Sequence, residues 1–168
     1  MNNIYNIIGL ILILFLQIFI CNEINFLGYI NPYIYVAFIF ILPFTEKRFI
    51  PLSLAFLYGL TIDLFSDTGG IHAFSLVFVC YIRIFFLKIF FRKSDFDFLL
   101  FRLHQESFSR VLNYVLTLTF IHHFIMFLLA NFSFANFTNL LLNTLYATIF
   151  TVTLYLLGAF LFKRKTTV

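Results

Sequence analysis

The chain has 168 residues, of which 62% are hydrophobic and only 11% are charged. A soluble domain needs roughly a quarter of its residues charged to solvate its surface, so a large soluble catalytic domain is excluded. The net charge of +4 comes from basic residues beside apolar runs, where they face an anionic lipid leaflet rather than nucleic acid. The sequence therefore predicts an all-α integral membrane protein that does not bind nucleic acid.

Six segments are long and apolar enough for membrane helices when the chain is divided at its charges, prolines and glycines. The first covers residues 4–20. Pro32 can occupy the first turn of a second, short helix over residues 32–44, and Pro51 opens a third over residues 51–65. No linker or internal repeat divides the chain, so residues 1–168 are predicted to form one compact bundle of six transmembrane helices. The last three helices are expected at 71–91, 108–130 and 137–162.

Basic residues occur in alternate connections between these helices. The connections after the first, third and fifth helices contain none, whereas nine of the eleven lie in or at the edge of the connections after the second and fourth helices and in the tail after the sixth. By the positive-inside rule, both termini then lie in the cytoplasm. The nine residues are Lys47, Arg48, Arg92, Lys93, Arg102, Arg110, Lys163, Arg164 and Lys165.

Two of the connections have features of their own. Residues 66–70, Ser-Asp-Thr-Gly-Gly, favour a tight turn, which makes the third and fourth helices antiparallel neighbours. After the fourth helix, Ser94 and Asp97 have the spacing of a capping box, and apolar residues recur at helical intervals. A short interfacial helix over residues 95–104 and a simple elbow before the fifth helix both fit this pattern.

Charged side chains within a membrane are costly and often functional, and Asp63 near the end of the third helix is one of them. Ala55, Gly59 and Asp63 share one helix face, so the two small residues allow another helix to approach closely. His72 follows just across the Gly70 turn. We expect Asp63 and His72 to form a hydrogen-bonded pair that fixes this hairpin. A proton relay is disfavoured because no chain of further acids continues through the membrane.

Arg83 lies about 18 Å along the fourth helix, slightly past the membrane midplane, so it must be paired or reach toward the interface. His72, Ser75 and Val79 share its face. The expected partners are polar side chains on the last two helices, which would join the helices by hydrogen bonds. A small-ligand cavity is the alternative interpretation. The expected partner side chains are Asn113, Thr117, Asn143 and Thr151.

The other candidates for chemistry do not assemble into a site. His122 and His123 are adjacent and point about 100° apart on a helix, which argues against both binding one metal ion. Metal-binding spacings of Cys and His are lacking, as are nucleotide-binding motifs, and the acidic residues offer no close intramembrane pair for acid and base roles. We therefore expect no metal, no cofactor and no enzymatic activity.

Several short motifs occur in a characteristic order. They are NPYIYV from residue 31, LPF from residue 42, GLTIDLF from residue 59, GIHAF from residue 70 and YIR from residue 81. In order and spacing they resemble the rod shape-determining MreD family, in a form similar to Bacteroidetes-type members. The resemblance covers roughly residues 30–85 by motif and the whole chain by length and number of helices. The candidates for helix packing or partner contact are Pro32, Gly59, Asp63, Gly70, His72 and Arg83.

This resemblance implies a non-enzymatic component of the bacterial cell-elongation complex, located in the inner membrane. Its expected partners are the periplasmic scaffold MreC, the actin-like MreB and the synthases that build lateral peptidoglycan. The family is also similar in its six-helix plan to the substrate-binding subunits of energy-coupling-factor transporters. A small-molecule-binding transporter subunit is therefore the alternative function.

Overall fold

Every regular element that the structure describes is a helix, in agreement with the predicted fold class. The computed structural model describes residues 3–24, 31–45, 48–91, 103–132 and 136–161. Five helices are long and apolar enough to cross a bilayer, and each of their ends lies within two residues of its predicted position. They are α1 (Asn3–Phe19), α3 (Phe49–Ser66), α4 (Ile71–Phe91), α5 (Phe108–Asn131) and α6 (Phe137–Leu161).

The remaining elements are short. They are helix α2 (Ala37–Ile41) and the 3-10 turns η1 (Cys21–Glu23), η2 (Ile34–Val36) and η3 (Leu103–Gln105). The predicted interfacial helix over residues 95–104 falls largely outside the described residues, and only η3 lies at its end.

The predicted second helix, residues 32–44, is wrong in its length. The turn η2 has three residues and α2 has five, so together they rise only about 12 Å and cannot cross a bilayer as a helix. The helix ends at Ile41 because Leu42 precedes Pro43, and a residue before proline is driven out of the helical region. Leu42 accordingly has φ −59° and ψ 134°. Chain without regular structure flanks these short helical elements, and we name residues 31–45 the central segment.

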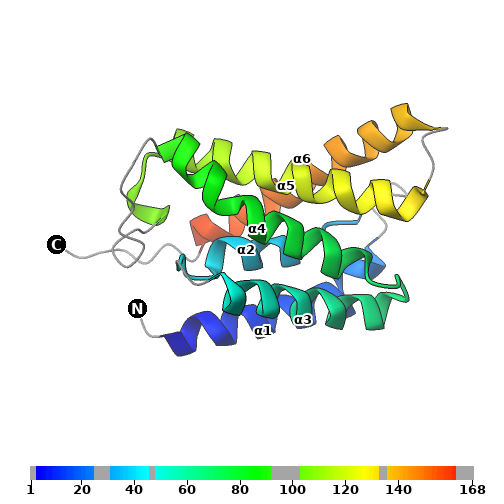
Figure 1. The fold of residues 1–168 in the computed structure, drawn as a ribbon, viewed down its shortest axis with the longest axis horizontal. Helices are drawn as coiled ribbons and strands as arrows, with labels where there is room; N and C mark the ends of the chain where they lie inside the picture. The colour runs from blue at the N-terminus through cyan, green and yellow to red at the C-terminus, as the bar shows by residue number, and fades with distance from the viewer. Residues whose placement is uncertain (1–2, 25–30, 46–47, 92–102, 133–135, 162–168) are drawn as a thin grey trace.

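Figure 1 shows the central segment passing through the middle of the molecule, between the end of α1 and the start of α3. Its side chains are among the most buried in the protein: Tyr35 and Ile39 are fully buried. Each of the five long helices contacts it. The contacting residues are Gln17 of α1, Tyr58 of α3, His72 and Arg83 of α4, His122 of α5 and Thr151 of α6.

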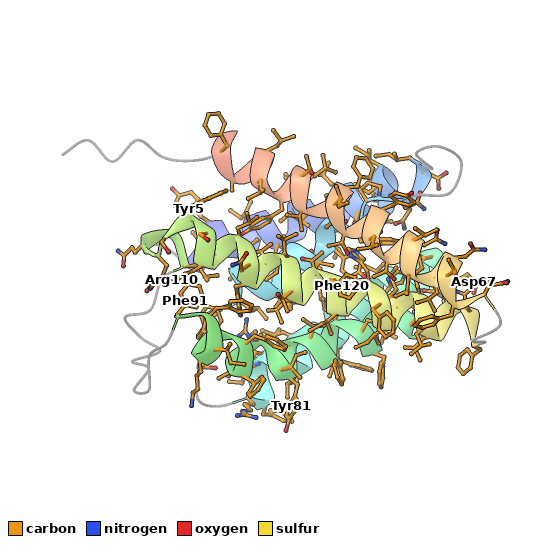
Figure 2. All side chains as sticks on the ribbon, turned by 90° about the horizontal axis from the view of Figure 1, so that it is seen from above. Tyr5, Asp67, Tyr81, Phe91, Arg110 and Phe120 are labelled. Atoms are coloured by element: carbon orange, nitrogen blue, oxygen red, sulfur yellow. The ribbon has the colours of Figure 1, made fainter. Side chains whose placement is uncertain are left out.

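The helices α1, α3 and α5 run in one direction and α4 and α6 run in the other, because the central segment returns the chain between α1 and α3 (Figure 1). Figure 2 shows Tyr5, Phe91 and Arg110 at one end of the molecule and Asp67 at the other. The start of α1, the end of α4 and the start of α5 therefore share one end. The turn between α3 and α4 lies at the opposite end, away from Arg110 of the predicted cytoplasmic side.

This arrangement gives a direct test of orientation. In intact cells, single cysteines in the connections without basic residues should react with a membrane-impermeant maleimide, and cysteines in the basic connections should not, because the positive-inside rule places the latter in the cytoplasm. The background is a protein whose Cys21 and Cys80 are replaced by alanine. Reversed labelling would overturn the orientation, and labelling of both sets would contradict the alternating path. The reactive positions are Asn25, Asp67 and Asn136, and the unreactive ones are Lys47, Lys93 and Lys165.

Candidate functional site

The α3–α4 hairpin is built on a close helix crossing. A Cβ atom at Gly59 would lie 2.5 Å from the Cα of Ala73, so α4 approaches α3 at a distance that only glycine permits. One helical turn further along α3, the Asp63 carboxylate accepts the backbone N–H groups of His72 at 2.9 Å and Ala73 at 2.8 Å, and the Thr68 hydroxyl. These N–H groups lack partners within α4, and the positive end of the helix dipole favours a carboxylate there. Asp63 is therefore the N-terminal cap of α4.

Asp63 and His72 are thus in contact, but through the backbone of His72 and not through its ring. Asp63 is 3% exposed, and both of its oxygens accept hydrogen bonds from α4. The turn that brings the two together requires Gly70 at φ +98°, a value that other residues rarely adopt. The expected hydrogen-bonded pair is therefore present, and it uses the His72 backbone because the free N–H groups in the first turn of α4 bind the carboxylate.

The ring of His72 binds Tyr35 of the central segment instead. The Tyr35 hydroxyl lies 2.7 Å from Nδ1 of His72 and 3.1 Å from Nε2 of His122, and 3.8 Å from the sulfur of Met126. Tyr35 and His122 are fully buried. One hydroxyl group therefore links the central segment, α4 and α5, and we name these four residues the Tyr35 cluster.

A second buried histidine lies beside this cluster. His123 Nδ1 is 3.2 Å from the hydroxyl oxygen of Thr148 on α6. The Tyr33 ring is close to the rings of both His123 and His72, with centroid distances of 5.3 Å and 6.0 Å. The Tyr33 ring thus packs against the imidazole rings of both His72 and His123.

Side chains from α1 and α6 satisfy the backbone where the central segment begins. The Gln17 amide donates to the Pro32 carbonyl at 3.2 Å and accepts the Tyr35 N–H at 3.3 Å. The Tyr33 N–H donates to the Thr151 hydroxyl at 3.1 Å. Non-helical backbone is tolerated within a membrane only where such partners exist. Pro32 lies two residues before Ile34, the first residue of η2, and so does not occupy a first helical turn.

Arg83 satisfies the backbone where α2 ends. Its guanidinium donates to the carbonyls of Ile39 at 2.7 Å, Leu42 at 3.2 Å and Pro43 at 2.8 Å, and lies 4.8 Å from the centre of the Phe44 ring. The last carbonyls of a helix lack intrahelical partners, and a cation is favoured at that end of the helix dipole.

The expected partners of Arg83 are wrong. None of the four polar side chains predicted from the last two helices is among its hydrogen-bond acceptors in the described part of the chain, and Thr151 binds the Tyr33 N–H instead. The acceptors are backbone carbonyls, which the short length of α2 leaves free.

Sequence reasoning missed the Tyr35 cluster, Gln17 and Thr148 as parts of one site. The depth of the two histidines in the membrane is a signal from which their contact could have been predicted. His122 lies fourteen residues into α5, about 21 Å from the helix start, which is the level of the outer half that His72 also occupies. Among the described residues, no group of three or more His, Cys, Asp or Glu side chains has a metal-binding arrangement.

The six motif positions singled out from the sequence thus lie around the central segment and the α3–α4 hairpin, which they hold together. The chemistry available there is hydrogen bonding to the backbone and proton exchange among hydroxyl and imidazole groups. No protein-family model, curated protein or solved structure matches the chain.

Proposed function

We propose that the protein is a non-enzymatic component of the bacterial cell-elongation complex in the inner membrane, in line with its motif resemblance to the MreD family. The observation that supports this proposal is the structural role of the motif residues. Gly59, Asp63 and Arg83 fasten helices to one another and to the central segment. Residues that fix a rigid membrane unit are what a scaffold requires, because its partners must find the same surface each time.

The outer surface of this unit is apolar and available to other membrane proteins. The helix α1 packs on the rest of the protein along one side only, and Phe15 on its outer side is 57% exposed. Within a bilayer, helices associate through packing of such surfaces. The proposed partners are a periplasmic scaffold of the MreC type, which approaches through its transmembrane helix, the actin-like MreB, and the peptidoglycan synthases.

One observation favours the alternative, a substrate-binding subunit of an energy-coupling-factor-type transporter. Interrupted helices near the membrane midplane form the substrate sites of many transporters, and the central segment is interrupted in this way. Here, however, the freed backbone groups are bound by Gln17, Thr151 and Arg83 of the protein itself. The scaffold is therefore the better-supported proposal.

Crosslinking and depletion separate the two functions. A photo-crosslinking residue in place of Phe15 should capture the transmembrane helix of the MreC-type scaffold, because this side chain points away from the bundle. The same probe in place of the buried Val115 is the control and should capture no partner. Depletion of the protein should turn rod-shaped cells round while solute uptake continues.

The transporter alternative predicts a different outcome. The Phe15 probe would then capture ATPase subunits, and depleted cells would keep their shape and grow normally once a single nutrient is supplied. That result would contradict the scaffold proposal.

A further inference from the structure

The hydrogen position on His123 follows from its partner. The Thr148 hydroxyl has a single hydrogen, which it donates to the Thr144 carbonyl at 2.7 Å, since a carbonyl can only accept. Thr148 must then accept from His123, so the hydrogen of this imidazole is on Nδ1. The Nε2 atom of His123 carries a lone pair, and among the described residues it has no hydrogen-bond partner.

The positions of the hydrogens around Tyr35 follow from its donors and acceptors in the same way. Its hydroxyl can donate once, and it lies between His72 Nδ1 and His122 Nε2, so with neutral rings one imidazole donates to it and the other accepts from it. His122 Nδ1 is buried and has no partner within the described part of the chain. A buried N–H without an acceptor is rarer in proteins than an unpaired lone pair, so the hydrogen of His122 is on Nε2. His122 therefore donates to Tyr35, and Tyr35 donates to His72.

A third neighbour gives the hydroxyl another direction in which to point. The Met126 sulfur lies 3.8 Å from the Tyr35 oxygen and can only accept. If a proton is added to His72 Nδ1, the Tyr35 O–H can turn to this sulfur while its oxygen accepts from both imidazoles. All three hydrogen bonds are then made, and no heavy atom has to move. In this step the lone pair of His72 Nδ1 gains one proton, and no bond between heavy atoms forms or breaks.

We propose that His72 is a buried proton-binding residue and that the Tyr35 hydroxyl is the rotor that exposes or occupies its lone pair, with Met126 as the alternative acceptor. This inference goes beyond the proposed function and does not depend on it. The site belongs to the end of the bundle that carries the α3–α4 turn, because His72 is the second residue of α4. Protons would therefore reach it from the non-cytoplasmic side in the predicted orientation.

The burial of His72 disfavours a positive charge on its ring, and the Asp63 carboxylate beside it favours one. Among the described residues, the groups around it are the Asp63 carboxylate from α3, Tyr33 and Tyr35 from the central segment, and His122 and His123 from α5. The uncharged Gln17 of α1 and Thr148 of α6 bind Tyr35 and His123 behind them. A carboxylate among neutral imidazoles stabilises a first positive charge. The positive charge on His72 would then disfavour a second proton on the neighbouring imidazoles.

Protonation would also strengthen the attachment of the central segment. In the protonated form, two N–H groups donate to the Tyr35 oxygen, and the bond from the imidazolium is charge-assisted and about twice as strong as a neutral one. A proton taken up from outside thus tightens the contact between the central segment and α4.

The test is nitrogen NMR of the purified protein in detergent micelles with ¹⁵N-labelled histidine, which distinguishes the two neutral tautomers from the imidazolium. The protein has four histidines, and single His→Gln variants assign the signals. At alkaline pH, His123 should be the Nδ1–H tautomer, and His72 and His122 the Nε2–H tautomer. On acidification, His72 should gain a second N–H while His122 and His123 keep their tautomers.

Variants show whether the rotor matters. Met126→Leu keeps the volume but removes the sulfur acceptor, and should lower the affinity of His72 for its proton about tenfold. Asp63→Asn should lower it at least as much. Tyr58→Phe is the matched control, since it removes another hydroxyl of the interior, one that donates to the Leu10 carbonyl, and should leave His72 unchanged.

Three results would overturn the proposal: His72 remaining neutral at every pH at which the protein stays folded, His122 or His123 becoming charged first, or Met126→Leu titrating like the wild type. Should Asp63→Asn fail to fold because it also caps α4, the wild-type titration and Met126→Leu still decide the question.

Discussion

Replacement of Arg83 by methionine is expected to destabilise the protein by about 3 kcal/mol or more, because three carbonyls, two of them in buried hydrogen bonds, lose their donor at once. Methionine fills a similar volume, so the loss of packing is small and the unpaired carbonyls dominate. An interhelical hydrogen bond in a membrane averages only about 0.6 kcal/mol, but an unsatisfied backbone group in lipid costs several kcal/mol. Thermal unfolding in detergent, followed by size-exclusion chromatography, measures the shift.

Two companion variants identify the cause. Arg83→Lys keeps the charge but lacks the planar fork that binds several carbonyls, so its stability should be intermediate. Lys88→Met on the same helix removes an exposed charge and should be close to neutral. If Arg83→Met unfolded at the wild-type temperature, Arg83 would not hold the central segment.

A methyl group at Gly59 should have the second large effect. Its Cβ would lie 2.5 Å from Ala73 Cα and 2.8 Å from Ala73 N, and since both are backbone atoms, no side chain can turn aside to admit it. The helices must separate, which loosens the cap that Asp63 provides for α4. Overpacking of this kind costs about 1–3 kcal/mol, more than the roughly 1 kcal/mol that alanine gains over glycine in a helix. Gly59→Ala should therefore lower the unfolding temperature, and Gly59→Leu should lower it further.

Gly158→Ala on α6 is the matched control. A Cβ there meets nothing within 4 Å, so only the helix propensity acts and the variant should be neutral or up to about 1 kcal/mol more stable. Equal shifts for the Gly59 and Gly158 variants would show that the close crossing of α3 and α4 does not contribute to stability.

The five long helices could be predicted because the information that defines them is local. Charges, prolines and glycines divide the chain, and the apolar runs between them have the length of a bilayer crossing. The second helix is shorter than predicted because Pro32 lies before its start and Pro43 drives Leu42 out of the helical region. Its true end was therefore present in the sequence as the Leu42–Pro43 pair.

The candidate site could be predicted only in part, because its partners are distant in the chain or have no sequence signal. Asp63 and His72 were expected in contact, and the turn between them made this a local inference. The binding of His72 to Tyr35, 37 residues away, depends on how three elements pack. Arg83 binds backbone carbonyls, which every residue possesses, so no residue type marks them in advance.

The central segment has a consequence for how the chain is made in the membrane. Synthesis proceeds from the N-terminus, so this segment leaves the ribosome before four of the five helices that contact it. The hydroxyl that accepts the Tyr33 N–H belongs to a residue made 118 positions later, and the guanidinium that binds the Pro43 carbonyl is made 40 positions later. A short helix with unpaired flanking backbone is not stable in lipid alone. Biogenesis must therefore complete this early part of the chain last, after α6 has entered the bilayer.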